Sequence, residues 1–260
     1  MKLEGNVAIV TGGAKAIGLH IASKLASEGA HVVIADIDAA AAEEAAVGIT
    51  RAYGREAAGM GVDVTDERQV EALIAFAVER FGTVTILVNN AGIMGPVDET
   101  DKVDVDGWDV TMAVNLRGVF LSSKHVIPVM KQRKAGSIIN VASITGKRPL
   151  PLRLAYATSK MGVIGLGRSL AAEVGKFGIR VNTVCPGSVT GERQQHVFEG
   201  IMKASGKSYE EVATEKAEVT ALKTFVDPDY IAHCVVYLCS DESWVITGQD
   251  INICGGAVMY

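Results

Sequence analysis

Short runs of β-branched and other apolar residues alternate along this chain with longer segments in which apolar residues recur every three or four positions. The short runs predict strands and the longer segments predict helices. Strands are expected over Val7–Thr11, His31–Asp36, Gly59–Val64, Val84–Asn89, Ser137–Val141, Arg180–Cys185 and Asp250–Cys254. Helices are expected over Ile17–Glu28, Ala39–Tyr53, Glu67–Arg80, Trp108–Lys131, Ala155–Lys176 and Pro228–Ser240.

This alternation is typical of a parallel sheet that is covered by helices on both faces. With right-handed crossovers it predicts an α/β fold, a doubly wound, Rossmann-type sheet of seven parallel strands. The length of 260 residues suits a single domain of this kind, and no linker, repeat or low-complexity stretch divides the chain. We therefore expect residues 1–260 to form one domain.

One segment does not follow the alternation. Residues 190–225 form a long insertion between the sixth and seventh predicted strands. Long excursions in compact domains often serve as lids or binding loops, and this one begins just after the carboxyl end of a strand, where ligands bind in open α/β sheets. We expect a substrate-binding lid that closes on binding, with Gly191, Gly200 and Gly206 as candidate hinges.

Composition and charge narrow the function classes. The net charge of −5 gives no electrostatic support for a nucleic-acid role. The apolar segments are too short for a signal sequence or a membrane span, and the five histidines lack metal-ligand spacing. We expect a cytoplasmic protein with no metal site and with reduced, mostly buried thiols at Cys185, Cys234, Cys239 and Cys254.

A glycine-rich turn follows the first predicted strand directly. It reads TGGAKAIG over residues 11–18 and leads into the first predicted helix. Glycines let the backbone approach a phosphate, and the helix N-terminus supplies free N–H groups and the positive end of the helix dipole. Between a strand and a helix, this cluster predicts a dinucleotide site, with a plain glycine turn as the alternative.

Two charged side chains near this turn favour different nicotinamide cofactors. Asp36 ends the second predicted strand, where a carboxylate binds ribose hydroxyls and repels a 2′-phosphate. Lys15 favours the opposite, because an ammonium attracts a 2′-phosphate. We give Asp36 more weight, since a like-charge contact costs more than an exposed lysine gains, and we predict NAD. Alternatively Asp36 caps the next helix, a task that Asp38 suits equally well.

A second group of residues suits acid/base chemistry. Tyr156 and Lys160 are four positions apart in a helical pattern, so they share a face, and the ammonium lowers the phenol pKa toward neutrality. Ser143 follows a predicted strand and is either a substrate-binding hydroxyl or an ordinary turn serine. Asn115 lies within a predicted helix, where it is either a buried amide that needs partners or a surface residue.

These residues together resemble the short-chain dehydrogenase/reductase family in its compact, NAD-preferring form, over nearly the whole chain. TGGAKAIG is similar to the family's cofactor turn, residues 89–92 to its NNAG segment, and residues 186–189 to its PG segment at the nicotinamide. The resemblance implies four catalytic residues, Asn115, Ser143, Tyr156 and Lys160. It implies cofactor contacts from Gly12, Lys15, Ile17, Gly18, Asp36, Asp63, Val64, Asn90, Ala91, Gly92, Tyr156, Lys160, Pro186, Gly187 and Val189.

The resemblance also implies a mechanism and an assembly. Tyr156 takes the alcohol proton as hydride leaves for NAD, Ser143 steadies the carbonyl oxygen, and Lys160 lowers the Tyr156 pKa and binds the nicotinamide ribose. Asn115 holds a water that links Lys160 to solvent. Family members are commonly homotetramers, paired through the two long helices that match Trp108–Lys131 and Ala155–Lys176.

Three positions depart from the family pattern. Ala16 replaces a usual glycine, and its methyl group either crowds the pyrophosphate or sits harmlessly at the helix start. Gly191 replaces a common threonine that contacts the carboxamide, a contact that Thr190 would have to supply. Cys254 stands where aspartate is common, which predicts the loss of a structural hydrogen bond.

The substrate is expected to be a secondary alcohol or carbonyl compound, such as a sugar, polyol or hydroxy acid. A partly basic set of side chains favours an anionic or hydroxyl-rich substrate, unless these side chains face solvent or a neighbouring subunit. The set consists of Lys147, Arg148, Arg153, Arg193, Gln194, Gln195 and His196. Two alternatives remain: an NADP-dependent carbonyl or ketoacyl reductase, which Lys15 favours, and a non-catalytic dinucleotide sensor, which the Tyr156–Lys160 pair disfavours.

Overall fold

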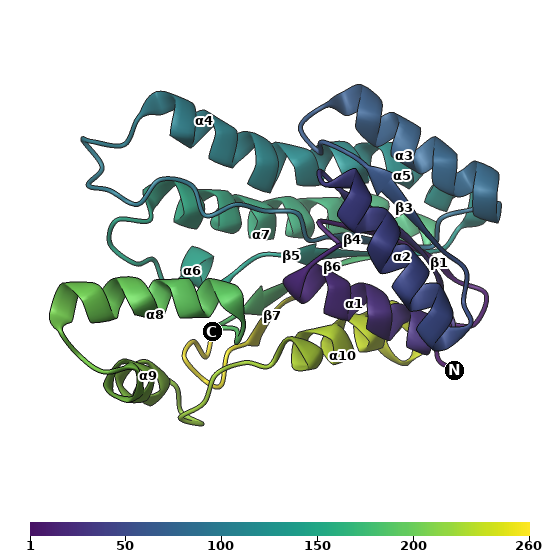
Figure 1. Cartoon of the computed structure of the whole chain (residues 1–260). Coiled ribbons are helices and arrows are strands. Elements are labelled where there is room, and N and C mark those ends of the chain that lie inside the picture. The colour runs from purple at the N-terminus through teal and green to yellow at the C-terminus, as the bar shows by residue number, and fades with distance from the viewer.

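A seven-stranded parallel sheet runs through the middle of the molecule (Figure 1). The structure is a computed structural model, and it describes residues 1–191, 194–195, 197–203 and 205–260. The strand order is β3-β2-β1-β4-β5-β6-β7, so the order reverses between β1 and β4. The strands are β1 (Val7–Thr11), β2 (His31–Asp36), β3 (Ala57–Gly61), β4 (Ile86–Asn89), β5 (Gly136–Val141), β6 (Ile179–Pro186) and β7 (Asp250–Ile253).

Helices cover both faces of this sheet, which confirms the predicted doubly wound fold (Figure 1). One face carries α1 (Ala16–Ser27), α2 (Ala39–Tyr53) and α10 (Pro228–Cys239). The other carries α3 (Glu67–Phe81), α5 (Gly118–Arg133) and α7 (Leu154–Val174), with α4 (Val105–Met112) beside α7. The central strands are mostly apolar because both of their faces are buried, and every residue of β1 is buried.

The third strand, Ala57–Gly61, begins two residues earlier and ends three residues earlier than the predicted Gly59–Val64. It pairs with β2 only as far as Asp36 opposite Gly61, where β2 ends. Beyond that point the chain turns, because the Asp63 Oδ1 atom accepts hydrogen bonds from the Thr65 backbone N–H and hydroxyl, both at 2.8 Å. Such an aspartate turn competes with continued strand pairing.

The predicted helix Trp108–Lys131 is not continuous. It begins earlier, at Val105, and α4 and α5 are separated by a π-helical segment, Ala113–Arg117, that contains Asn115. A π-helical turn rotates the following side chains relative to an ordinary helix and is frequent at functional sites. The prediction of one regular helix was therefore wrong at its centre.

The excursion at residues 190–225 contains two helices that the hydrophobic pattern did not predict, α8 (Glu192–Ser205) and α9 (Tyr209–Glu218). They lie on the left of Figure 1, far from the N-terminus. The base of the excursion is closed, because Thr190 N–H donates to Val226 O at 3.0 Å and Val226 N–H donates to Ser188 O at 2.9 Å. Within it, the buried Phe198 ring contacts Tyr209 and Phe225.

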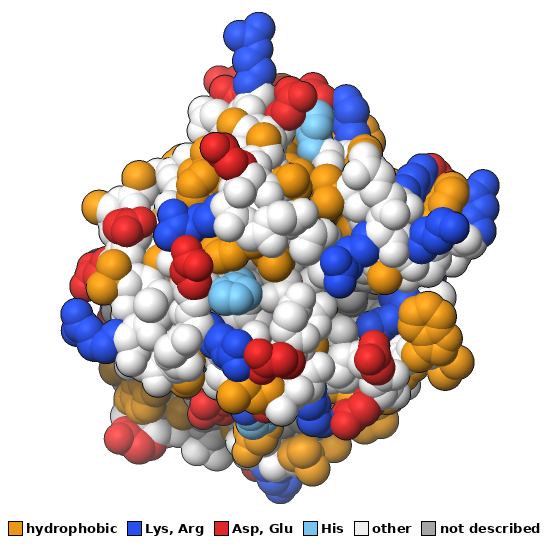
Figure 2. Space-filling view, turned by 90° about the vertical axis from the view of Figure 1, so that its right-hand side faces the viewer, with side chains coloured by type: hydrophobic (Ala, Val, Ile, Leu, Met, Phe, Trp, Pro, Cys, Tyr) orange, Lys and Arg blue, Asp and Glu red, His pale blue; other side chains and the backbone are white. Residues whose placement is uncertain are grey.

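Charged side chains of both signs are interspersed on the face shown in Figure 2. Over the described surface as a whole, charged side chains also form exposed ion pairs, such as Arg80 with Glu56 and Lys124 with Glu67. On the face shown, this mixture provides no single-sign field of the kind that draws a polyanion to a surface. Among the described helices, none is both long and apolar enough to span a bilayer.

Candidate active site

The glycine turn folds tightly between β1 and α1. Gly12 has a φ of +59°, and a Cβ atom there would lie 2.8 Å from the Ala91 Cα atom. A Cβ atom on Gly18 would lie 2.0 Å from the Gly12 carbonyl oxygen, so any side chain there would collide with the turn. Only glycine fits these two positions, and together they form a cradle of backbone without side chains.

The N-terminus of α1 adds polar backbone groups to this cradle. Lys15 is the N-cap, it makes no side-chain capping bond, and the first turn contains no acidic residue. Ala16 begins the helix with a φ of +48°. The methyl group of Ala16 is therefore not harmless, because an L-residue is strained in the left-handed region.

Asn90 connects the glycine turn to β4. Its side-chain amide donates to Thr11 O at 3.0 Å and Gly12 O at 2.8 Å. In return, the Thr11 hydroxyl oxygen accepts from the backbone N–H groups of Asn90 and Ala91, at 3.1 and 3.2 Å. Thr11 is a structural contributor that the sequence reasoning did not single out. This network holds the carboxyl ends of β1 and β4 together at the point where the strand order reverses.

Asp36 and Asp38, at the end of β2, have different roles: Asp36 contacts the glycine turn and Asp38 caps α2. Asp36 Oδ2 accepts from the Ala14 N–H in the glycine turn at 3.2 Å, and Oδ1 accepts from the Asp38 N–H at 3.2 Å. Asp38 is the N-cap of α2 and accepts from Ala41 N–H at 3.1 Å. Asp36 therefore is not the cap, and its carboxylate lies at the rim of the glycine turn.

Lys15 lies against Asp38, with 3.1 Å between Nζ and Oδ2. The bond from the Ala41 N–H and then the Lys15 ammonium hold the pKa of Asp38 below its ordinary value. Both side chains are largely exposed to solvent. The rim thus carries two carboxylates and one ammonium, which leaves it negative.

Asp63 and Val64, two of the predicted cofactor contacts, follow β3 at the carboxyl ends of the strands. The Asp63 carboxylate is used within its own turn, and Val64 is buried against Gly118 at the start of α5. The Asp63 N–H donates to Gln69 Oε1 at 2.9 Å. Ile17, in the first turn of α1, is partly buried against the core on that face of the sheet.

Asn115 is completely buried, which excludes the surface alternative. Its Oδ1 atom accepts from Ile93 N–H at 2.8 Å, and its Nδ2 atom donates to Ile93 O at 2.9 Å. Nδ2 also donates to the Ser159 hydroxyl at 3.0 Å. The π-helical turn thus aims this amide at the segment after β4 and at α7, and Ser159 is a partner that sequence reasoning missed.

Lys160 is buried within α7, with 5% of its surface exposed. Its ammonium donates to Val141 O, at the end of β5, at 2.9 Å and lies 5.8 Å from the centre of the Tyr156 ring. A Cβ atom on Gly92 would lie 3.3 Å from Lys160 Nζ, so the NNAG segment reaches the same ammonium. The predicted site residues Tyr156 and Gly92 therefore both lie near the buried ammonium of Lys160.

Ser143 lies two residues beyond Val141 and is buried. It is the N-cap of the short helix α6 (Ile144–Lys147), and its Oγ atom accepts from Thr145 N–H at 3.1 Å. Beneath it, the Ser143 N–H contacts the sulfur of Cys185 in β6. Burial raises the pKa of the Cys185 thiol to about 11, so this residue is an uncharged support at neutral pH.

The PG segment follows β6 and is held by residues near the C-terminal end and by Val226. Gly187 N–H donates to Ile253 O at 2.9 Å, and Val189 pairs with Val226 in an isolated bridge. Pro186 is the last residue of β6. The exposed Thr190 directs its hydroxyl to Val226 O at 3.5 Å, at the base of the excursion.

Cys254, which stands where the family commonly has aspartate, still forms hydrogen bonds. Cys254 is buried, Val258 N–H donates to its sulfur at 3.4 Å, and its thiol donates to Val258 O at 3.4 Å. The predicted loss of a hydrogen bond at this position was wrong, because the thiol provides both a weak donor and a weak acceptor.

The basic side chains expected near the substrate differ in what they contact. Lys147 is engaged by Asp250 at 2.6 Å, and Arg148 donates to Ala257 O at 3.4 Å. Gln194 donates to the Ser188 hydroxyl at 3.2 Å. Arg153 is the N-cap residue of α7, three positions before Tyr156, whereas Gln195 is exposed. Arg193 and His196 lie outside the described residues.

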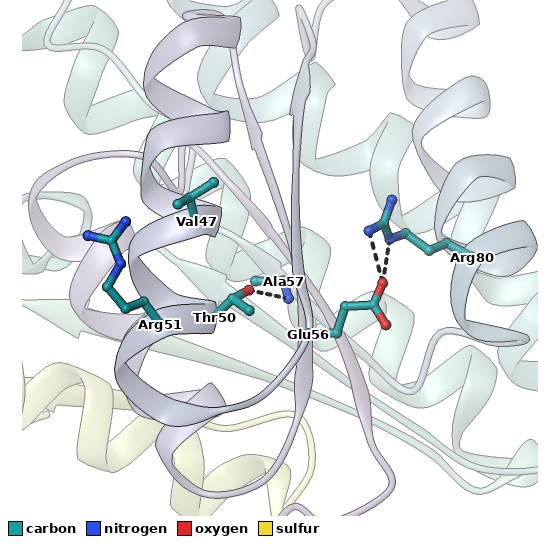
Figure 3. Close-up of a pocket in the computed structure, with 6 residues that line it drawn as sticks. All are labelled: Val47, Thr50, Arg51, Glu56, Ala57 and Arg80. Atoms are coloured by element: carbon teal, nitrogen blue, oxygen red, sulfur yellow. Dashed lines mark hydrogen bonds and ion pairs between the residues drawn. The ribbon is translucent and has the colours of Figure 1, made fainter.

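A surface hollow lies elsewhere, at the amino end of β3 (Figure 3). Three of its polar side chains are engaged, since Glu56 bonds Arg80 and Thr50 accepts from Ala57 N–H. Ala57 is the first residue of β3, so the hollow lies at the amino-terminal ends of the strands. The site residues described above lie at their carboxyl ends. Among the described side chains, no cluster of three or more His, Cys, Asp or Glu residues suits a metal ion.

Comparison with known proteins finds similarity along the whole chain. A family model described as enoyl-(acyl carrier protein) reductase matches residues 12–258. The chain is 36% identical over 255 residues to the 2-(S)-hydroxypropyl-CoM dehydrogenase 3 of Xanthobacter autotrophicus, which covers 98% of this chain and 97% of that protein.

Solved structures agree with this similarity. The crystal structure of NAD⁺-bound xylitol dehydrogenase gives a TM-score of 0.93 with 30% identity, over 98% of this chain and 100% of that one. A variant of actinorhodin polyketide ketoreductase with NADPH gives a TM-score of 0.92 with 35% identity, over 98% of each chain. Similar structures therefore occur with either nicotinamide cofactor.

Proposed function

The protein belongs to the short-chain dehydrogenase/reductase family, and from that premise we propose that it is an NAD-preferring enzyme that interconverts a secondary alcohol and its carbonyl compound, with Tyr156 as acid/base. The observation that carries the proposal is the buried Lys160 ammonium, which joins the end of β5 to the Tyr156 ring. An ammonium next to a phenol favours the phenolate and lowers its pKa.

The chain's own residues fit a dinucleotide. The cradle at Gly12 and Gly18 has no room for side chains, and the α1 N-terminus lacks a side-chain cap, so backbone N–H groups are left to hold a pyrophosphate. Asp36 would accept the adenosine ribose hydroxyls. Contacts along the nicotinamide half would come from residues 90–92, Pro186, Gly187 and Val189.

Bound NAD⁺ supplies the hydride acceptor. Tyr156 then removes the alcohol proton, and Ser143 donates a hydrogen bond to the substrate oxygen as it becomes a carbonyl. Lys160 stabilises the Tyr156 phenolate. Because the Asn115 side chain is engaged with Ile93 and Ser159, its role in this scheme is to fix the shape of the π-helical turn. In the reduction direction each proton moves the opposite way.

The charge at the glycine turn supports NAD over NADP. A 2′-phosphate would meet the Asp36 carboxylate, whereas Lys15, which attracts it, is already paired with Asp38.

A second candidate function is an NADP-dependent ketoacyl reductase, which Lys15 and the similarity to a ketoreductase with NADPH favour. The similarity to xylitol dehydrogenase favours polyols and sugars as the first compounds to test.

Two further proposals concern shape and assembly. We infer that residues 190–225 form a lid whose base is closed at Ser188–Thr190 and Val226, so that α8 and α9 move together over the substrate. Protease sensitivity of this segment that does not change with NAD⁺ and substrate would argue against closure.

We also infer a cytoplasmic homotetramer paired through α4, α5 and α7, whose outer surface exposes Val110, Phe120 and Met161. A monomer in light scattering would refute the tetramer.

The test of the proposed function is a panel of sugars, polyols, hydroxy acids and steroids, with NADH formation as the readout. We expect turnover of at least one secondary alcohol with a higher kcat/KM for NAD⁺ than for NADP⁺. Asp36→Ala should shift the ratio toward NADP⁺, while Asp229→Ala, in the first turn of α10 where the exposed carboxylate contacts His20, is the matched carboxylate control. Equal use of both cofactors by the unmodified protein, unaltered by Asp36→Ala, would refute the NAD preference.

A further inference from the structure

The helix α6 carries Ser143 at its start and is too short to hold its own orientation. It has four residues, and its internal bonds are few: Gly146 N–H donates to Ser143 O at 3.1 Å and Arg148 N–H donates to Ile144 O at 2.7 Å. A single helical turn fixes many dihedral angles for few hydrogen bonds, so it is unstable alone. The position of the Ser143 hydroxyl therefore depends on anchors outside α6.

One anchor is a direct contact with α7. A Cβ atom on Gly146 would lie 2.8 Å from the Met161 nitrogen and 2.9 Å from the Lys160 carbonyl carbon. The absence of a side chain at Gly146 lets the backbone of α6 lie against the backbone of α7. This contact fixes the distance between α6 and the helix that carries Lys160, but one contact does not fix the tilt of the turn.

The other anchor is Lys147 at the end of α6. Its side chain is 6% exposed, and its ammonium lies 2.6 Å from Asp250 Oδ2. The same ammonium donates to Asp250 O at 3.1 Å and to Tyr260 O at 2.9 Å. Because an ammonium has three donors, these three acceptors use all of them, and Lys147 is not available to a substrate.

Asp250 begins β7 and holds this anchor in place. Its Oδ1 atom accepts from Arg168 Nε at 2.9 Å, and its side chain is 10% exposed. Burial acts to raise the pKa of Asp250, but the bonds and charges of Lys147 and Arg168 outweigh it and hold the pKa below its ordinary value. The carboxylate is therefore charged at neutral pH, and removal of either partner leaves a poorly compensated charge in a nearly buried site.

We propose that Lys147, held by Asp250, is a positioning residue that sets the Ser143 hydroxyl for catalysis by tying α6 to β7. The inference rests on the proposed function, in which Ser143 binds the substrate oxygen. Lys147 contacts neither substrate nor cofactor in this scheme, so its whole effect on rate passes through Ser143.

A double-mutant cycle tests this role. Lys147→Met should lower kcat on a turned-over alcohol about tenfold, since misplacing a catalytic group by about 1 Å costs up to roughly 10²-fold in rate. KM and the Kd for NAD⁺ should stay within about twofold. On a Ser143→Ala background the same change should lower kcat less than about twofold, because residues that act as a unit are not additive. Lys124→Met, which breaks an exposed ion pair with Glu67, is the matched control.

Amide hydrogen exchange gives a readout that needs no activity. In Lys147→Met the Gly146 and Arg148 amides should exchange at least about tenfold faster, while amides in the centre of α7 keep their protection. If the single variant is unstable, Lys147→Met combined with Asp250→Asn removes both charges and should give the same kinetic and exchange changes.

Three results would overturn the inference: equal losses of kcat on both backgrounds, an unchanged kcat in Lys147→Met, or unchanged exchange at Gly146 and Arg148. An unmodified protein that oxidises no alcohol counts against the proposed function instead, and the exchange measurement still decides whether Lys147 anchors α6. A protein that needs Ser143 but not Lys147 counts against this inference alone.

Discussion

Replacing Ala16 with glycine should stabilise the protein, although most alanine-to-glycine changes in helices do the reverse. Ala16 begins α1 with a φ of +48°. An L-residue in the left-handed region costs roughly 1–2 kcal/mol, whereas glycine adopts it freely. Against this gain stands the larger entropy of glycine in the unfolded chain, roughly 0.5–1 kcal/mol. The difference raises the free energy of unfolding by about 0.5–1 kcal/mol.

Thermal unfolding followed by circular dichroism measures the effect. For a chain of this size, about 1 kcal/mol corresponds to a rise in Tm of roughly 2–4 °C. The control is Ala40→Gly on the exposed surface of α2, where the same chemical change should lower stability by about 1 kcal/mol. A lower Tm for Ala16→Gly, of the same sign as the control, would show that the left-handed conformation at residue 16 is not strained and would refute the reasoning.

Three further changes test other parts of the fold. Gly18→Ala should destabilise the protein by more than about 2 kcal/mol in urea unfolding, because its Cβ atom would overlap the Gly12 carbonyl, whereas Gly48→Ala, with open space around it, should stabilise by about 1 kcal/mol. Asn115→Leu should cost about 3 kcal/mol by the same measurement, because Ile93 loses partners for its N–H and C=O, and a cost below about 1 kcal/mol would contradict the buried bonding. Asp250→Asn should be less stable than the unmodified protein at neutral pH. The lowered pKa of Asp250 contributes stability above the unfolded pKa of about 3.9, and this is lost as pH falls through the folded pKa, so the two urea midpoints should converge in acid.

The sheet was predictable because its information is local. The runs Val7–Thr11 and His31–Asp36 are mostly apolar, and their predicted ends coincide with those of the observed strands β1 and β2. The helix Ala39–Tyr53 was also predicted with its observed bounds, because Asp38 caps its start and Gly54 ends it in a left-handed conformation. Where local signals agree in this way, tertiary contacts do not shift the ends of the strand or helix.

The predicted and observed elements differ where contacts with residues distant in the sequence determine the local structure. The break in the helix Trp108–Lys131 depends on Ile93, which pairs with Asn115 across 22 positions of the sequence. The third strand ends early because its neighbour β2 ends at Asp36. The helix α6, with four residues, is too short for any periodic pattern. The helix α9 had a signal that was overlooked, the Ser208 and Glu211 capping box.

The candidate site was predictable in its members but not in their bonding. The order of Asn115, Ser143, Tyr156 and Lys160 in the chain identified a group, yet the sequence gives no sign that Lys160 is buried against Val141 O. The basic residue Lys147 was expected near the substrate or in solvent, and its burial against Asp250 follows only from the topology that brings β7 beside β6. The catalytic roles themselves stay predictions.

Tyr156→Phe tests the central claim most directly, because it removes one oxygen atom from the group proposed to move the proton. In the unmodified protein, turnover of an alcohol found in the panel should depend on a single deprotonation, and the variant should lose about 10³-fold in kcat. Its Kd for NAD⁺, measured by fluorescence titration, should change less than about twofold. A folded variant that binds NAD⁺ and turns over at the unmodified rate would contradict the account.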